Sequence, residues 1–188
     1  MKRRQVTDEE LIAGLRGSHR EAEAAFTEIY SRYAQRTYAF ILRMMGDGAA
    51  SEDILQEVFL KFFTATRQQL VFTNLRAFIF MIARNQCLNY KRDVPQTEPI
   101  EHLEFVVHEF SAAIEQNELL QLVTLSLELL EMEYREAFVL KYYQGCSYEE
   151  MSQLTGDTIP ALKNRVWRAK EQIRLALKPY IIEEQHNK

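Results

Sequence analysis

Residues 146–174, CSYEEMSQLTGDTIPALKNRVWRAKEQIR, decide the C-terminal fold of this chain, because they encode a short helix, a tight turn and a basic second helix. Ser147 and Glu150 have the spacing of a capping box, which predicts where the first helix begins. Gly156 predicts where that helix ends, since glycine readily takes the left-handed conformation that closes a helix. This order of elements is typical of a helix-turn-helix that binds DNA.

The second helix is predicted to begin at Thr158, a capping residue, with Pro160 in its first turn, and to run to about Leu177. Its apolar side chains recur at helical spacing and form one stripe: Leu162, Val166, Ala169 and Ile173. Between Ala161 and Lys178 there are six lysines and arginines against the single acid Glu171, whereas the whole chain has a net charge of −4. A cationic helix on an acidic protein favours DNA contact over its alternative, an ordinary solvated face.

Length and composition predict an all-α protein. The chain has 188 residues, 47% of them hydrophobic, with six glycines and four prolines, and helix-period patterns fill most of it. It contains no run of eighteen apolar residues, and MKRRQVTDEE at its start lacks the apolar segment of a secretion signal. Cys87 and Cys146 are predicted to be buried free thiols, which suits a reducing compartment. We therefore expect a soluble, cytoplasmic protein.

The distribution of charge predicts two small helical domains joined by an acidic linker. Between Asp93 and Glu133 there are ten acids and no lysine or arginine. The first part of this segment contains two prolines and no sustained helical period, which is typical of a linker. The predicted boundaries are residues 1–92 for the first domain, 93–111 for the linker and 112–188 for the helix-turn-helix domain.

Capping signals also divide the first domain into helices. Two pairs have capping-box spacing: Thr7 with Glu10, and Ser18 with Glu21. The long helix that starts at Ser18 is predicted to end at Gly46 and Gly48, and Ser51 is predicted to cap the next one, EDILQEVFLKFF. The outer side of that helix carries a polar stripe at three- and four-residue spacing: Asp53, Gln56, Glu57 and Lys61. Spacing alone favours an ordinary solvated face for this stripe.

The segment LRAFIFMIARNQCLNYKR predicts a further helix that changes character along its length. Its first half is apolar nearly all round, and Phe78 and Phe80 are expected in the core. Its second half opens a polar sector that includes Arg84, Asn85, Asn89 and Arg92. With Phe72 and Tyr90 nearby, this sector has the chemistry of a single-stranded nucleic-acid site, where aromatic rings stack on bases and guanidinium groups hold phosphates.

Three motifs in this order and spacing, EDILQEVFLKFF, NLRAFIFMIARNQCLNYKR and YREAFVLKYYQGCSYEEMSQLTGDTIPALKNRVWRAK, resemble a bacterial RNA polymerase sigma factor. The similarity is to the extracytoplasmic-function (ECF) type of the sigma-seventy superfamily and covers about Asp8 to Leu177. It implies an alternative sigma factor that binds core RNA polymerase, recognises the minus-ten and minus-thirty-five promoter elements and directs transcription initiation. An anti-sigma factor is a further partner expected from this resemblance.

The resemblance also implies roles for particular residues. It implies that Asp53, Gln56 and Glu57 bind polymerase, which replaces the solvated face that spacing alone favours. The melted minus-ten strand would be held by the loop 69–74, including Phe72, and by one side of the following helix: Arg76, Arg84, Asn85, Asn89 and Arg92. The minus-thirty-five duplex would be contacted by the second helix of the helix-turn-helix: Lys163, Asn164, Arg165 and Arg168.

Within that second helix, Asn164 and Arg165 are predicted to read base edges, because they lie near the helix start. Arg174 lies more than two turns further on and is expected to offer only charge to phosphate. The chain departs from many relatives around the turn, where Thr155 and Asp157 stand in place of apolar residues and Pro160 in place of a glycine. Trp167 either packs against the domain or lies against the DNA backbone, and we favour packing.

Two functions of other classes are alternatives. An autonomous helix-turn-helix regulator that acts without polymerase explains the C-terminal third but leaves the first domain unexplained. A helical enzyme is disfavoured, because the sequence has no Gly-rich phosphate loop, nucleophile elbow or zinc-protease motif. His102 and His108 are expected to be solvated linker residues rather than metal ligands. We therefore predict no catalytic residue, cofactor, metal site or small-molecule substrate.

Overall fold

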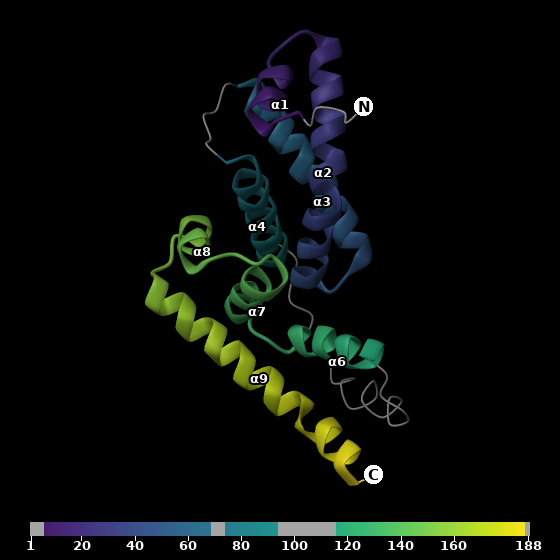
Figure 1. Ribbon diagram of the computed structural model, residues 1–188, viewed down its shortest axis with the longest axis vertical. Coiled ribbons are helices and arrows are strands. Elements are labelled where there is room, and N and C mark those ends of the chain that lie inside the picture. Colours follow the sequence, from purple (N-terminus) through teal and green to yellow (C-terminus); the bar gives the residue numbers. More distant parts are fainter. Residues whose placement is uncertain (1–5, 69–73, 94–115, 187–188) are drawn as a thin grey trace. The chain divides into compact units, whose positions relative to one another are not determined.

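The computed structural model describes residues 6–68, 74–93 and 116–186, which form helices and no strand, as Figure 1 shows. The described chain divides into two compact units, residues 1–90 (unit 1) and 91–188 (unit 2). The all-α prediction is confirmed, whereas the predicted domain boundaries stay a prediction. Most of the expected linker and the first five residues of the loop 69–74, Phe72 included, lie outside the described residues. No helix within the described ranges is long and apolar enough to cross a membrane.

Unit 1 is built from helices α1 (Asp8–Leu15), α2 (His19–Met45), α3 (Gly48–Arg67) and α4 (Leu75–Asp93). Both predicted capping boxes are present at the starts of α1 and α2. Gly46 closes α2 in the left-handed conformation, with φ of 76°. Local hydrogen bonding therefore fixes the ends of α2 as the sequence predicts.

The start of α3 differs from the prediction. Asp47, not Ser51, caps this helix: its carboxylate accepts from the amides of Ala49 and Ala50 at 2.8 and 3.4 Å. Gly48 is the first residue of α3 instead of a helix stop. Ser51 is buried in the first turn, and its hydroxyl donates to the Asp47 carbonyl. The prediction was wrong because Asp47 caps the helix four residues before Ser51. The amides that Ser51 would have capped then lie inside the helix and are not available to its hydroxyl.

An aromatic and aliphatic core holds unit 1 together. Phe40 of α2 meets Phe80 of α4 edge-on, with ring centroids 5.5 Å apart. Cys87 is buried and forms no disulfide, as predicted. At the N-terminal end, the Tyr33 hydroxyl donates to the Asp8 carboxylate at 2.6 Å and ties α1 to α2. Burial, followed by this hydrogen bond, raises the pKa of Tyr33 to about 12.

Unit 2 contains α6 (Gln116–Glu128), α7 (Met132–Phe138), the π-helix η1 (Val139–Tyr143), α8 (Tyr148–Thr155) and α9 (Ile159–His186). The helix-turn-helix signals are confirmed, since the Ser147–Glu150 box starts α8 and Gly156 ends it with φ of 80°. The predicted apolar stripe of α9 is buried: Leu162, Val166, Ala169 and Ile173. This stripe seats α9 against α6, α7 and α8. α9 continues past the predicted end at Leu177.

A buried arginine fixes the angle between the first two helices of unit 2. Arg135 is 6% exposed, and its Nη2 donates to the backbone carbonyls of Glu128 and Leu130 at 2.7 and 3.4 Å. Burial lowers the pKa of Arg135, and the charge of Glu128 opposes that shift. The guanidinium thereby satisfies carbonyls at the end of α6, which orders the support beneath α9.

Candidate protein and nucleic-acid interfaces

The outer side of α3 presents acids around an exposed apolar side chain. Asp53 and Gln56 are exposed, and Glu57 is half-buried with its carboxylate 3.5 Å from Lys61 Nζ. Lys61 also donates to the side chain of Gln86 on α4 at 2.8 Å, which orders this pair. Leu60 lies three residues after Glu57 on the same side of α3 and is 61% exposed.

We define the α3 face as Asp53, Gln56, Glu57 and Leu60. The structure thus brings the three predicted polymerase-binding residues together and adds Leu60, which the sequence prediction missed. Its spacing of seven residues from Asp53 is the signal that could have found it. An apolar centre with a polar, charged surround is the usual composition of a protein–protein interface.

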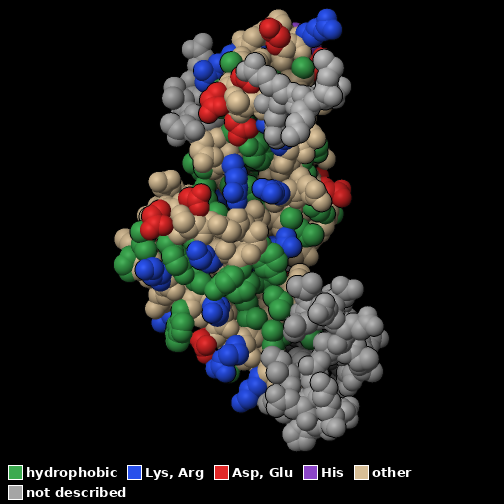
Figure 2. All heavy atoms as spheres, in the orientation of Figure 1, with side chains coloured by type: hydrophobic (Ala, Val, Ile, Leu, Met, Phe, Trp, Pro, Cys, Tyr) green, Lys and Arg blue, Asp and Glu red, His purple; other side chains and the backbone are tan. Residues whose placement is uncertain are grey.

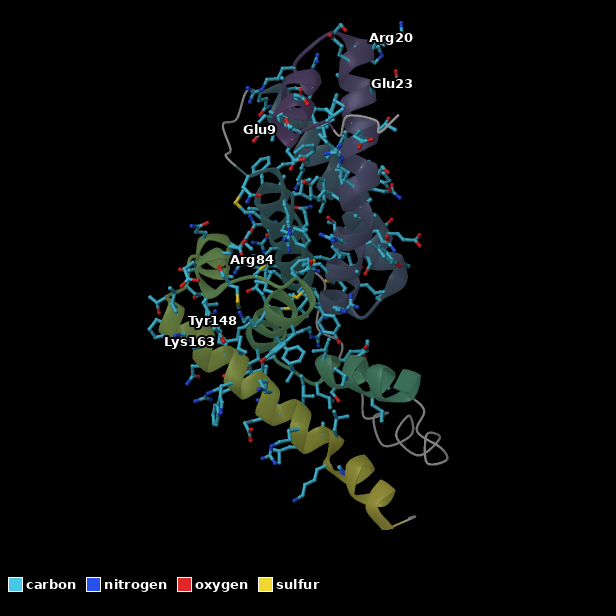
Figure 3. All side chains as sticks on the ribbon, viewed as in Figure 1. Glu9, Arg20, Glu23, Arg84, Tyr148 and Lys163 are labelled. Carbon is cyan, nitrogen blue, oxygen red and sulfur yellow. The ribbon has the colours of Figure 1, made fainter. Side chains whose placement is uncertain are left out.

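The second half of α4 presents a polar surface. Asn85, Asn89 and Arg92 are exposed, and Arg84, labelled in Figure 3, is half-buried. Arg92 forms an ion pair with Asp93 at 2.9 Å, and this hydrogen bond raises its pKa. These four residues project from neighbouring positions of the helix, as the minus-ten prediction requires.

Arg76 stands apart from that surface. It is half-buried near the start of α4, and its guanidinium carbon lies 5.8 Å from the centre of the Phe80 ring. Because Phe80 is only 3% exposed, this contact directs Arg76 toward the core of unit 1. The structure therefore groups four of the five described minus-ten residues and separates the fifth.

The outer surface of α9 is cationic. Lys163, Asn164 and Arg168 are exposed, and Arg168 Nε donates to the Asn164 side chain at 3.0 Å. In Figure 2, Lys and Arg side chains follow the α9 edge of unit 2, with hydrophobic surface between them. Amide and guanidinium groups in this setting can form hydrogen bonds with base edges or phosphates.

One flank of α9 combines lysines with aromatic rings. Lys163 Nζ lies 5.6 Å from the centre of the Tyr148 ring at the start of α8, and Figure 3 shows these two side chains together. Lys141 Nζ lies 4.6 Å from the same ring, and Lys170 Nζ lies 6.0 Å from that of Tyr142. These contacts hold ammonium groups at the surface without neutralising their charge.

Trp167 lies on this same flank, one turn after Lys163. It is 60% exposed, so the favoured prediction that it packs against the domain is wrong. The buried stripe already fills the contact with α6, α7 and α8, which leaves the indole at the surface. We refer to Lys163, Trp167, Lys170, Tyr142 and Tyr148 as the aromatic–cationic flank.

Arg165 projects from nearly the opposite side of α9 to Lys163, because two residues advance a helix by about 200°. Its Nη1 donates to Asp157 Oδ2 at 2.5 Å, and its Nη2 lies 3.1 Å from Glu133 Oε2. Its side chain is 23% exposed. By helix position Arg165 lies about 60° from Arg168 and about 100° from Asn164. What distinguishes it from the other three predicted minus-thirty-five residues is its two ion pairs within unit 2, and its role as a base reader stays a prediction.

The described residues contain no group of three or more His, Cys, Asp or Glu side chains that could hold a metal ion. The candidate sites in this part of the chain are three helix surfaces: an acidic and apolar one on α3, a polar one on α4 and a cationic one on α9.

Two known protein families match the parts of the chain that carry these surfaces. Residues 29–94 match the family Sigma-70 region 2, and residues 120–173 match the family Sigma-70, region 4. The chain belongs to the sigma-70 family of RNA polymerase sigma factors. Region 2 contains the α3 face and the polar surface of α4, and region 4 contains the helix-turn-helix with the outer surface of α9.

Curated relatives identify the branch of this family. The chain is 29% identical to the RNA polymerase sigma factor CarQ of Myxococcus xanthus, over 81% of this chain and 89% of that protein. It is 26% identical to the ECF sigma factor SigM of Bacillus subtilis, over 78% of this chain and 91% of that one. This sigma factor is therefore of the ECF type, an alternative initiation factor and not an enzyme.

Solved structures agree on the fold. A sigma factor from Bartonella quintana, RpoE, solved in complex with the anti-sigma factor NepR, has a TM-score of 0.63 and 25% identity, covering 81% of this chain and 96% of that chain. CnrH, solved with the cytosolic domain of CnrY, has a TM-score of 0.66 and 21% identity, covering 92% and 97% of the two chains.

Proposed function

We propose that this sigma factor binds core RNA polymerase in the cytoplasm through the α3 face and directs it to promoters through α4 and α9. The observation that carries this proposal is the difference in charge between α3 and α9. The α3 face is acidic around an exposed Leu60, and residues 161–178 of α9 carry six cations against Glu171 on an acidic chain. Such a division fits one protein partner and one nucleic-acid partner.

On α4, we assign Arg84, Asn85, Asn89 and Arg92 to the melted strand of the minus-ten element. Exposed amides can bond unpaired bases, and the guanidinium groups supply charge for the backbone. Phe72 is proposed as a stacking ring for one of these bases, and it lies outside the described residues. Arg76, held against Phe80, is proposed to support the start of α4 while its charge remains within reach of the strand.

On α9, we assign Lys163, Asn164 and Arg168 to the minus-thirty-five duplex. Asn164 and Arg168 form a hydrogen-bonded pair on the outermost side of the helix, suited to a base edge in the major groove. The aromatic–cationic flank then faces a phosphate backbone, with the ammonium groups of Lys163 and Lys170 held over tyrosine rings. This arrangement separates base reading from phosphate contact.

An anti-sigma factor is proposed as a further partner. The Bartonella quintana relative was solved with such a protein bound, and it covers most of this chain. An inhibitor of this kind acts by covering a surface that polymerase or promoter needs. Loss of core binding when the inhibitor is added to the purified sigma factor tests this proposal.

Reconstituted transcription tests the function. The full chain is mixed with core polymerase and a promoter that carries both elements, and initiation from the expected start is measured. The expected result is promoter binding and initiation only when chain and core are both present. Tight binding of the duplex by the chain alone, without initiation on adding core, would instead identify an autonomous helix-turn-helix regulator.

A further inference from the structure

Arg165 is held by carboxylates from two different parts of unit 2. One partner, Asp157, lies in the turn between α8 and α9, and the other, Glu133, lies on α7. The turn is itself anchored at Asp157, whose amide donates to Thr155 Oγ1 at 3.1 Å and whose carbonyl accepts from Ser152 Oγ at 2.6 Å. Arg165 therefore connects the first turns of α9 to the turn before it and to the helix beneath it.

The charge around Arg165 is unfavourable for a DNA contact. Asp157, Glu133 and Glu136 all interact electrostatically with its guanidinium, so three acids surround one cation. Burial lowers the pKa of Arg165, but the hydrogen bond and charge of Asp157, followed by the charges of the two glutamates, raise it overall. A phosphate brought to this side of α9 meets a net negative surface.

The opposite flank has the reverse character. Lys163 and Lys170 lie against tyrosine rings, which hold them in place and leave their full charge available. Arg174, further along, is 63% exposed and pairs with a single acid, Glu171. Of these cations, Arg165 is the one whose charge is consumed within the domain by two ion pairs.

We propose that Arg165 is a positioning residue, which with Asp157 and Glu133 locks the start of α9 at the angle that presents Lys163, Asn164 and Arg168 to promoter DNA. This inference rests on the proposed function of α9 and identifies a residue that holds the DNA-binding surface in position. The lock replaces the apolar turn packing that the resemblance leads one to expect at Asp157. Base recognition then belongs to the outermost side of the helix, and Arg165 acts through its neighbours.

A double-mutant cycle with Arg165→Ala, Asp157→Ala and the combined variant tests the proposal. Polymerase-dependent promoter binding is measured across single-base variants of the minus-thirty-five element at several salt concentrations. We expect losses of about 10-fold for Arg165→Ala and about 3-fold for Asp157→Ala, with the combined variant no weaker than Arg165→Ala. The pattern of base preference and the salt slope should stay as in the parent protein, because no DNA contact is removed.

Other roles for Arg165 change the sign or the pattern of these results. If Arg165 reads a base, Arg165→Ala flattens the preference at one position. If it holds a phosphate, the salt slope falls by about one unit. In both of these cases Asp157→Ala strengthens binding, because it removes an acid next to the DNA, and either outcome overturns the proposal.

A measurement without DNA separates this inference from the proposed function. Amide hydrogen exchange of the full chain should be about 10-fold faster between residues 157 and 162 in each single variant than in the parent protein. The combined variant should exchange no faster than the single variants. Arg174→Ala is the matched control, since it removes an arginine of α9 that is distant from the turn, and it should leave this exchange unchanged. Unchanged exchange in Arg165→Ala overturns the lock. Failure of the parent protein to bind promoter with core overturns the proposed function, and the exchange result still decides the role of Arg165.

Discussion

The α3 face and the outer surface of α9 use charge in different ways. On α3, Asp53 is exposed, and Glu57 lies 3.5 Å from a single exposed lysine, Lys61, so the acids remain available to a partner. On α9, Arg165 is engaged by Asp157 and Glu133 inside the domain. A charged residue on a helix surface thus indicates a binding face only when its charge is not already used by the fold.

The same difference separates arginines within α9. Arg168 is exposed and donates to a neutral amide, Asn164, which leaves its charge uncompensated. Arg165 donates to carboxylates, which compensate it. Sequence composition counts both as members of one cationic helix, whereas the structure pairs Arg165 with two carboxylates and Arg168 with an amide.

Reversal of charge on the α3 face should give the largest effect. The double variant Asp53→Arg with Glu57→Arg is expected to weaken association with core polymerase at least about 100-fold, or roughly 3 kcal/mol, because like charges then face each other across the proposed interface. Binding of labelled sigma factor to core, measured by titration without DNA, checks this.

Glu23→Arg is the control for that reversal. Glu23 is an exposed acid on α2, away from the α3 face and labelled in Figure 3. This change should leave core affinity within about twofold of the parent, as is usual for exposed residues outside an interface. Equal loss in the control and the test variant would show that overall charge, and not the α3 face, governs the association.

Loss of the exposed guanidinium of Arg168 should give the next largest effect. Arg168→Ala is expected to cost about 1 to 3 kcal/mol in polymerase-dependent promoter binding and to relax preference at one base pair of the minus-thirty-five element. The control Lys170→Ala should weaken binding evenly and lower the salt slope by about one unit. Uniform loss across base variants in Arg168→Ala would make Arg168 a phosphate contact.

The sequence predicts well whatever depends on neighbours three or four residues away. The Ser147–Glu150 box, the Gly156 stop and the buried stripe of α9 all belong to this class, and all are confirmed. The start of α3 was predicted wrongly, because Asp47 and Ser51 are both good caps and only the backbone path decides between them. α9 also runs past the predicted end at about Leu177, and it continues through Pro179, a residue type that usually marks a helix stop.

Contacts distant in the sequence explain the rest. Glu133 meets Arg165 only because α7 packs against α9, and no local period shows this pairing. Leu60 has the spacing of the α3 face, but whether an apolar residue at the edge of a helix is buried depends on what packs beside it. Each candidate surface was therefore predictable as a helix face. Which of its charged side chains are already engaged in ion pairs within the fold could be seen only in the structure.

Leu60 allows a smaller test of the α3 face. Leu60→Ala is expected to lower core affinity about fivefold, or roughly 1 kcal/mol, through the apolar area that no longer meets the partner. Thermal stability should not change, because the side chain is 61% exposed. Leu175→Ala is the matched control: Leu175 is 58% exposed, lies on α9, and should leave core affinity unaltered. A loss of stability in Leu60→Ala would indicate that this side chain supports unit 1 and not an interface.

The smallest effect is expected at Arg174, because this side chain is exposed and is already paired with an acid. Its guanidinium is 2.9 Å from Glu171 and 63% exposed, so solvent screens an ion pair that holds it only weakly. Arg174→Ala should weaken promoter binding about twofold for all base variants and lower the salt slope by up to about one unit, because only a phosphate contact is lost. Glu171→Ala should do the opposite and strengthen binding by a similar factor, since it frees the same guanidinium. Promoter binding with core polymerase, repeated over a salt series, measures both. If Glu171→Ala weakens binding instead, the pair orients Arg174, and this end of α9 then resembles the lock at Arg165 more than the open surface at Arg168.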